Sequence, residues 1–184
     1  MVSLLSVDNK HEHLRPILTA RQIYMGKAGF FFLLGIIQAL IVSIGDLVIL
    51  KAAVESPVLF VTIAVFSSLV FNSIIYTCVS MLGNPGKAVA IILLVLQIAG
   101  GGGTFPIQMT SEFFQALYPK VPFTYSIGLL REAVGGVYIP AVERDIKILF
   151  IYLIVVLVGG AILVSLKARS EKLSRERERS KLFL

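Results

Sequence analysis

Four long runs of apolar residues dominate this 184-residue sequence and limit what it can fold into. The hydrocarbon core of a bilayer is about 30 Å thick, and a helix of about 20 apolar residues crosses it. The runs predict membrane spans at about 28–50, 58–82, 88–103 and 146–166. The third run is apolar for only about 18 Å of helix, so its span has to include the glycines that follow it. The predicted fold class is therefore all-α integral membrane, with four transmembrane helices.

Composition excludes the common soluble classes. Hydrophobic residues make up 57% of the chain and charged residues 15%, whereas about a quarter of the residues of a soluble domain are charged. A disulfide-stabilised domain is excluded as well, because Cys78 is the single cysteine.

The distribution of basic residues predicts the orientation in the membrane. With the N-terminus in the cytoplasm, the outer segments would hold five of the 17 lysines and arginines, and the inner segments all the others. Those five are Lys51, Lys120, Arg131, Arg144 and Lys147. The positive-inside rule then places both termini on the cytoplasmic side. The membrane is expected to be a bacterial cell (plasma) membrane. The net charge of +6 is interpreted as topology, so no nucleic acid partner is expected.

The predicted organisation has three parts. Residues 1–27 form a cytoplasmic lead-in that is not expected to be a cleaved signal peptide. Residues 28–166 form the transmembrane domain, with an outer segment at 104–145. Residues 167–184 form a cytoplasmic basic tail, expected to be a solvated or membrane-surface helix.

The outer segment contains two predicted short helices. Thr110 or Ser111 is placed to cap a first helix, which ends before Pro119, and a second is expected from about Thr124 to Ala133. Both are amphipathic and too short to span, so they should lie in the outer interface or re-enter it. The polar and aromatic residues singled out on them are Glu112, Tyr125, Arg131 and Glu132.

A glycine run separates the third apolar run from these helices. Irregular backbone is tolerated at membrane depth only where it is buried in protein or lines a wet cavity. We therefore predict a re-entrant hinge made of Gly100, Gly101, Gly102, Gly103, Thr104, Phe105 and Pro106. A phosphate-binding loop is not favoured, because no Lys-Ser or Lys-Thr follows the glycines.

A few polar residues fall inside the predicted spans. They are Gln38, Ser68, Asn72 and Gln97. Ser68 and Asn72 begin a stripe that repeats every four residues to Ser80, and Gly35 begins a stripe of small residues on the first span. These groups either pack helices together or line a substrate pathway. Packing is favoured, because all of them are neutral.

Catalytic, metal and cofactor sites are not indicated. Asp46 is the one acid within a span, and we expect it at the outer interface, paired with Lys51. His11 and His13 have no third ligand nearby and are expected to be solvated. No nucleophile, base and orienting residue cluster as a hydrolase would need, so the chain is not expected to be an enzyme.

The sequence also resembles a known family. The segment GKAVAIILLVLQIAGGGGTFPIQMTSEFFQALYPKVPFTYSIGLLREAVGG is similar to the C-terminal membrane region of the phage infection protein family (YhgE/Pip), within the ABC-type-2 exporter permeases. RPILTARQIYMGK is similar to that family's cytoplasmic lead-in. The resemblance implies a homo- or hetero-oligomer of permease subunits working with a separate ATPase, and short outer helices above the substrate pathway. Full-length relatives begin with another span, a long extracellular region and a further span, so the resemblance implies that this chain corresponds to the last four of six spans. It is then expected to be a truncated member, a fragment or one part of a split protein.

Two functions follow from this resemblance. The first is the permease portion of an exporter for a hydrophobic or amphipathic substrate, driven by a separate ATPase. The alternative is a non-transporting membrane anchor, or a phage receptor component whose extracellular domain is on another chain.

Overall fold

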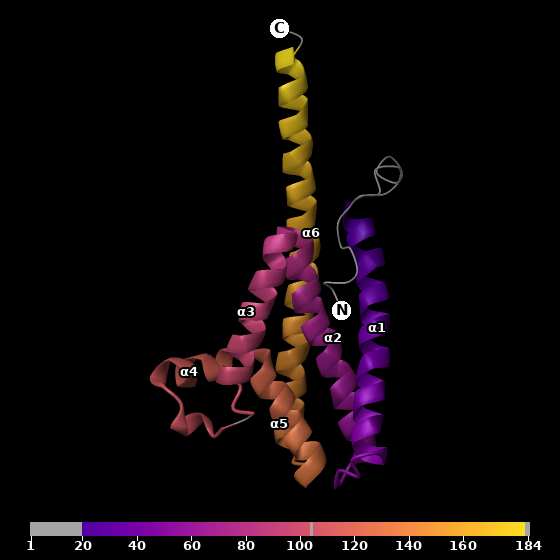
Figure 1. Ribbon diagram of the computed structural model, residues 1–184, viewed down its shortest axis with the longest axis vertical. Coiled ribbons are helices and arrows are strands. Elements are labelled where there is room, and N and C mark those ends of the chain that lie inside the picture. Colours follow the sequence, from indigo (N-terminus) through magenta and orange to yellow (C-terminus); the bar gives the residue numbers. More distant parts are fainter. Residues whose placement is uncertain (1–19, 104, 183–184) are drawn as a thin grey trace.

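The computed structural model describes residues 20–103 and 105–182, and every regular element in that part of the chain is helical. The α-helices are α1 (Ala20–Val48), α2 (Pro57–Leu82), α3 (Asn84–Gly100), α4 (Glu112–Leu117), α5 (Pro122–Gly135) and α6 (Ile139–Leu182). Two short 3-10 helices, η2 (Ile107–Met109) and η3 (Tyr118–Lys120), flank α4. Figure 1 shows α1, α2 and α6 running lengthwise, with α4 projecting to one side.

Three of the helices are long and apolar enough to cross a bilayer. Their apolar parts are Tyr24–Val48, Pro57–Leu82 and Ile139–Lys167, and α3 is a shorter apolar helix of 17 residues. Only 17–22% of each long apolar stretch is buried by the rest of the described chain. Such extensive apolar surface fits lipid or protein partners rather than water. The predicted all-α fold with membrane-length helices is confirmed.

α1, α2 and α6 meet in a core of aromatic and small residues near the start of α1. Tyr24, Ala28, Phe31, Tyr76 and Ala161 are buried together there. The Tyr76 hydroxyl donates to the Tyr24 carbonyl at 2.8 Å, and the Tyr24 hydroxyl shares a 2.7 Å hydrogen bond with Thr77 Oγ1. These bonds satisfy polar groups that would be costly to leave unpaired in an apolar setting.

A second core fixes α5 against α2 and α6. It contains Ile63, Val70, Leu129, Ala133 and Leu149. The far end of α5 is tied to the start of α2, because Ser56 N–H donates to the Ala133 carbonyl at 3.0 Å.

The start of α5 lies at the level of the middle of α2 and of the middle of the apolar part of α6. The ring of Phe123 is 5.8 Å from that of Phe71, and the Tyr152 hydroxyl donates to the Lys120 carbonyl at 2.8 Å. Figure 1 shows the consequence: α3 accompanies one half of the bundle and α5 accompanies the other. The short second helix predicted from 124 to 133 therefore occupies a place that a longer α3 would have filled.

Two helices are longer than the sequence indicated. α6 begins at Ile139 instead of 146. Lys147 pairs with Glu143 at 3.2 Å, the i, i+4 spacing that supports a helix, and Arg144 pairs with Asp145 at 2.9 Å. α6 then continues without a break through the basic tail to Leu182, since no glycine or proline follows Gly160. α1 begins at Ala20, eight residues before the predicted span.

Candidate functional site

The glycine run forms the junction where α3 ends and the chain turns aside. A Cβ on Gly101 would lie 2.7 Å from the Gln97 carbonyl oxygen and would collide with the Phe123 ring. Gly102 has a φ of +65°, a left-handed conformation that glycine adopts without strain, and a Cβ there would lie 3.0 Å from Tyr118. The absence of side chains thus lets η3 and α5 approach the end of α3. Thr104, predicted as part of the hinge, lies outside the described residues.

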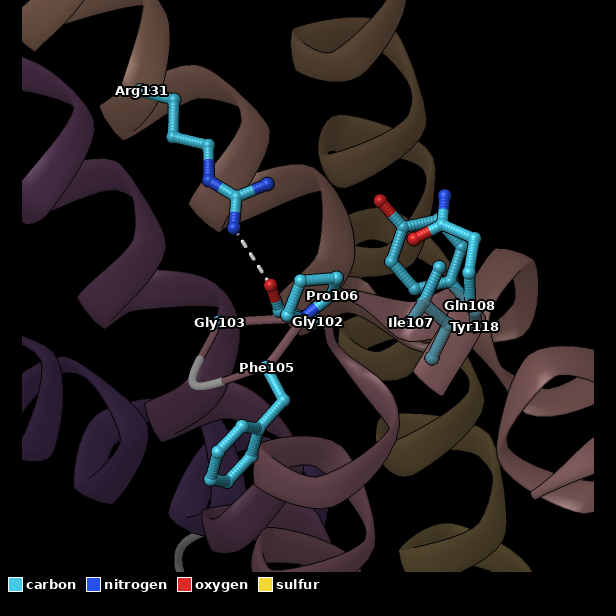
Figure 2. Close-up of a pocket in the computed structure, with 8 residues that line it drawn as sticks. All are labelled: Gly102, Gly103, Phe105, Pro106, Ile107, Gln108, Tyr118 and Arg131. Atoms are coloured by element: carbon cyan, nitrogen blue, oxygen red, sulfur yellow. Dashed lines mark hydrogen bonds between the residues drawn. The ribbon is translucent and has the colours of Figure 1, made fainter. Parts of the chain in front are cut away.

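Arg131 of α5 holds this junction. Its Nη2 donates to the Gly102 carbonyl at 2.7 Å, across 29 residues of sequence. Figure 2 shows the side chain reaching from α5 to the hinge, with Gln108 and Tyr118 on the other side of the accepting carbonyl. The hydrogen bond supplies a donor to a carbonyl that the end of α3 leaves without a helical partner.

A pocket of about 280 Å³ opens at the same place. Gly102, Gly103 and Arg131 form part of its lining, and Tyr118 and the segment from Phe105 to Gln108 form the rest. Most of the hinge residues predicted from the sequence, together with Arg131, are therefore brought to one pocket. Gly100 is instead buried beside Leu117, where a Cβ would lie 3.1 Å from the leucine Cδ2.

The other polar residues of the outer helices fasten the helices to their linkers. The Tyr125 hydroxyl donates to the Pro119 carbonyl at 2.7 Å, and Glu132 Oε2 accepts from the Tyr138 amide at 2.7 Å. Glu112 lies exposed in the first turn of α4, where its charge is favourable to the helix dipole. None of these three lines the pocket.

The sequence did not single out the buried acid at the contact of α5 with α6. Asp145 is only 4% exposed, and its carboxylate is bound by the mostly exposed Arg144 guanidinium. A Cβ on Gly128 would lie 2.6 Å from Asp145 Oδ2. The one sequence feature that pointed to this contact is Gly128, a glycine within an otherwise regular α5.

The polar residues predicted inside the spans do not gather in one place. Ser68 Oγ donates to the Gly35 carbonyl at 2.9 Å, and Asn72 Nδ2 donates to Ser68 Oγ at 3.3 Å, so these two sit at the contact of α1 and α2. Gln97 is buried in α3 with no partner for Oε1 among the described residues. Gln38 is exposed on α1. Whether these residues serve packing or a pathway stays a prediction.

The expected pair of Asp46 with Lys51 is not among the ion pairs formed within residues 20–103 and 105–182. Lys51 instead lies in the turn after α1 with a φ of +50°. The ion pairs in this part of the chain join Arg144 to Asp145 and Lys147 to Glu143.

Comparison with known proteins places this arrangement in a class of membrane transport proteins. Residues 9–162 match the model of the family described as ABC-2 family transporter protein, and the chain belongs to that family. Over 113 residues, 61% of the chain, it is 37% identical to "Uncharacterized protein YhgE" of Bacillus subtilis (strain 168). The resemblance to YhgE-type proteins is confirmed. The chain spans 15% of the length of that relative. No solved structure matches.

Proposed function

We propose that this chain is the membrane permease portion of an ABC-2-type exporter that moves a hydrophobic or amphipathic substrate with energy from a separate ATPase. The observation that carries the proposal is the family match over residues 9–162. The membrane-length helices of α1, α2 and α6 provide the spans that such a role needs. In this proposal the chain is not itself an enzyme, and ATP hydrolysis belongs to the partner.

The proposed topology has four crossings, with α3 and α5 sharing one of them. α3 would enter from the cytoplasmic side, α4 would project near mid-depth, and α5 would complete the crossing to the outer face. The contacts of Phe123 with Phe71 and of Ser56 with Ala133 support this placement of α5. Both termini would be cytoplasmic in a bacterial plasma membrane, as the positive-inside rule requires.

Cysteine labelling of intact cells tests this orientation. In a Cys78→Ser background, Ala53→Cys, in the exposed turn between α1 and α2, should react with a membrane-impermeant maleimide from outside. Ser170→Cys, beyond the apolar part of α6, should react only after permeabilisation. The reverse pattern would overturn the proposed orientation.

The transport role is tested by reconstitution with an ATPase encoded beside the gene. The two proteins should co-purify from mild detergent, and the permease should stimulate ATP hydrolysis in proteoliposomes. The turn between α2 and α3 is the expected contact, so Lys87→Glu should abolish most of the stimulation. Lys51→Glu, at the opposite end of the bundle, is the matched control and should leave it intact.

Two outcomes contradict the transport proposal. One is the absence of any co-purifying ATPase in the native host. The other is a complex that hydrolyses ATP at the same rate with and without the permease. Either result would favour the alternative, in which the chain is a non-transporting membrane component.

A further inference from the structure

Arg131 has no acidic partner in the described part of the chain. Among residues 20–103 and 105–182 it forms no ion pair, and its hydrogen bond goes to the neutral carbonyl of Gly102. That bond engages Nη2, and a guanidinium has five N–H donors. The neighbouring Glu132 accepts from the Tyr138 amide on the way to α6. Arg131 therefore retains both its charge and donor capacity.

The guanidinium lies alongside apolar helices. The α5 backbone runs from Phe123, at the level of Phe71 in the middle of α2, to Ala133, beside the start of α2. The Arg131 backbone lies near Ala133, but its guanidinium contacts Gly102. Gly101, the neighbour of Gly102, packs against Phe123, so the guanidinium lies near the level of Phe123. In the proposed topology this level lies near the middle of the bilayer, where a charged group is expensive and, as a rule, serves a function.

The pocket next to Arg131 combines polar and apolar groups. Gln108 and Tyr118 contribute an amide and a phenol, whereas Phe105, Pro106 and Ile107 contribute apolar surface. Its volume of about 280 Å³ is just below the range of pockets that enclose a whole drug-sized ligand, about 300–1,000 Å³. The pocket is thus suited to a headgroup, with any chain left outside along the apolar helices.

We propose that this pocket binds the anionic headgroup, phosphate or carboxylate, of an amphiphile whose apolar chain lies along the exposed surface of the bundle. Arg131 supplies charge-assisted hydrogen bonds to the head, and Gln108 and Tyr118 supply neutral ones. The inference rests on the proposed function in that it names the substrate class of the exporter as an acidic amphiphile. The same chemistry is offered by a resident acidic lipid and by an exported molecule that is foreign to the bilayer.

Binding can be followed with one reporter. The chain contains no tryptophan, and Phe105 is 68% exposed at the pocket, so Phe105→Trp introduces a single tryptophan there, which is excited selectively at wavelengths longer than those that tyrosine absorbs. The full chain is reconstituted in vesicles, where brominated lipids quench tryptophan on contact. Brominated phosphatidylglycerol should quench more strongly than brominated phosphatidylcholine. In a second arm, brominated dodecyl phosphate is added to phosphatidylcholine vesicles to represent a foreign amphiphile.

Two variants test the pocket in different ways. Arg131→Gln removes the cation and should lower the preference for the anionic head about ten-fold, the scale of one charge-assisted hydrogen bond, whereas Arg131→Lys should retain most of it. Gln108→Glu adds an anion to an exposed position at the pocket while keeping the Arg131 side chain, and it should also lower the preference. Lys120→Gln removes a nearby exposed charge that does not line the pocket, and it should have no effect.

The results separate the sources and the hypotheses. A preference in the first arm alone identifies a bilayer lipid, and a preference in the second identifies a foreign amphiphile. Equal quenching by anionic and zwitterionic lipids in both arms would overturn the inference, as would a preference that survives both Arg131→Gln and Gln108→Glu. Inorganic phosphate that displaces the lipid at equal concentration would refute the need for an apolar chain. ATPase stimulation is measured in the same preparation, so the inference can fail while the exporter role stands.

Discussion

Two adjacent glycines of α6 offer a sharp test of how the helices pack. A Cβ on Gly160 would collide with the Tyr24 hydroxyl and lie 2.8 Å from Thr77 Cγ2 and 2.9 Å from Thr77 Oγ1. A Cβ on Gly159 would meet nothing within 4 Å. We therefore expect Gly160→Ala to destabilise the bundle and Gly159→Ala to stabilise it.

The magnitudes follow from three terms. Replacing a helical glycine by alanine gains about 1 kcal/mol in either variant. At Gly160 the overpacking costs about 1–3 kcal/mol, and Thr77 cannot easily turn away because β-branched side chains are stiff at χ1 in helices. Loss of the bond between Tyr24 and Thr77 adds about 1 kcal/mol. The free energies of unfolding of the two variants should thus differ by about 2–4 kcal/mol in favour of Gly159→Ala.

The single cysteine provides the assay. Cys78 is half-buried in α2 next to Thr77, so a thiol-reactive fluorogenic dye reports unfolding in detergent as this side chain becomes accessible. One kcal/mol corresponds to about 2–4 °C for a chain of this size, which predicts midpoints about 4–16 °C apart. If Gly160→Ala melts at or above the temperature of Gly159→Ala, the described contact of α1, α2 and α6 is wrong.

Two further substitutions test the two cores by the same thermal assay. Leu129→Ala, at a fully buried position, should lower the free energy of unfolding by about 2–5 kcal/mol through the cavity it leaves. Leu166→Ala, at a position 55% exposed, is the control and should lower it far less. Equal losses of stability would refute the placement of α5. Tyr76→Phe removes the buried hydrogen bond to the Tyr24 carbonyl and should lower the free energy of unfolding by about 1 kcal/mol. Tyr138→Phe, at a position 65% exposed, is the control and should melt like the parent. An unchanged midpoint for Tyr76→Phe would contradict that hydrogen bond.

The sequence predicted the helices well where a single physical rule dominates. Length and apolarity located the long helices, and Pro119 correctly separated the two short ones. The sequence predicted helix boundaries less well where neighbouring charged side chains neutralise one another. The charged start of α6 was assigned to the outer segment, because pairing of Arg144 with Asp145 in a helix cannot be distinguished by composition from charges in a loop.

The candidate pocket was only partly predictable. The glycine run was predicted to be a hinge because irregular backbone needs shelter at membrane depth, and the structure ends α3 at Gly100 within this run. Its link to Arg131 depends on α5 passing beside the end of α3, a contact between segments 29 residues apart. No local pattern specifies which carbonyl an arginine will reach, so the pocket emerged only in three dimensions.

The uninterrupted course of α6 has a mechanical consequence. Its last 15 residues, beyond the apolar stretch that ends at Lys167, add about 22 Å of straight helix. From the contact of α5 with Leu149 to Leu182 the helix measures about 50 Å, so a tilt of about 10° at that contact would sweep the tip through about 9 Å. A small rearrangement at one face of the bundle would thereby be amplified into a movement that a protein beyond the other face could sense.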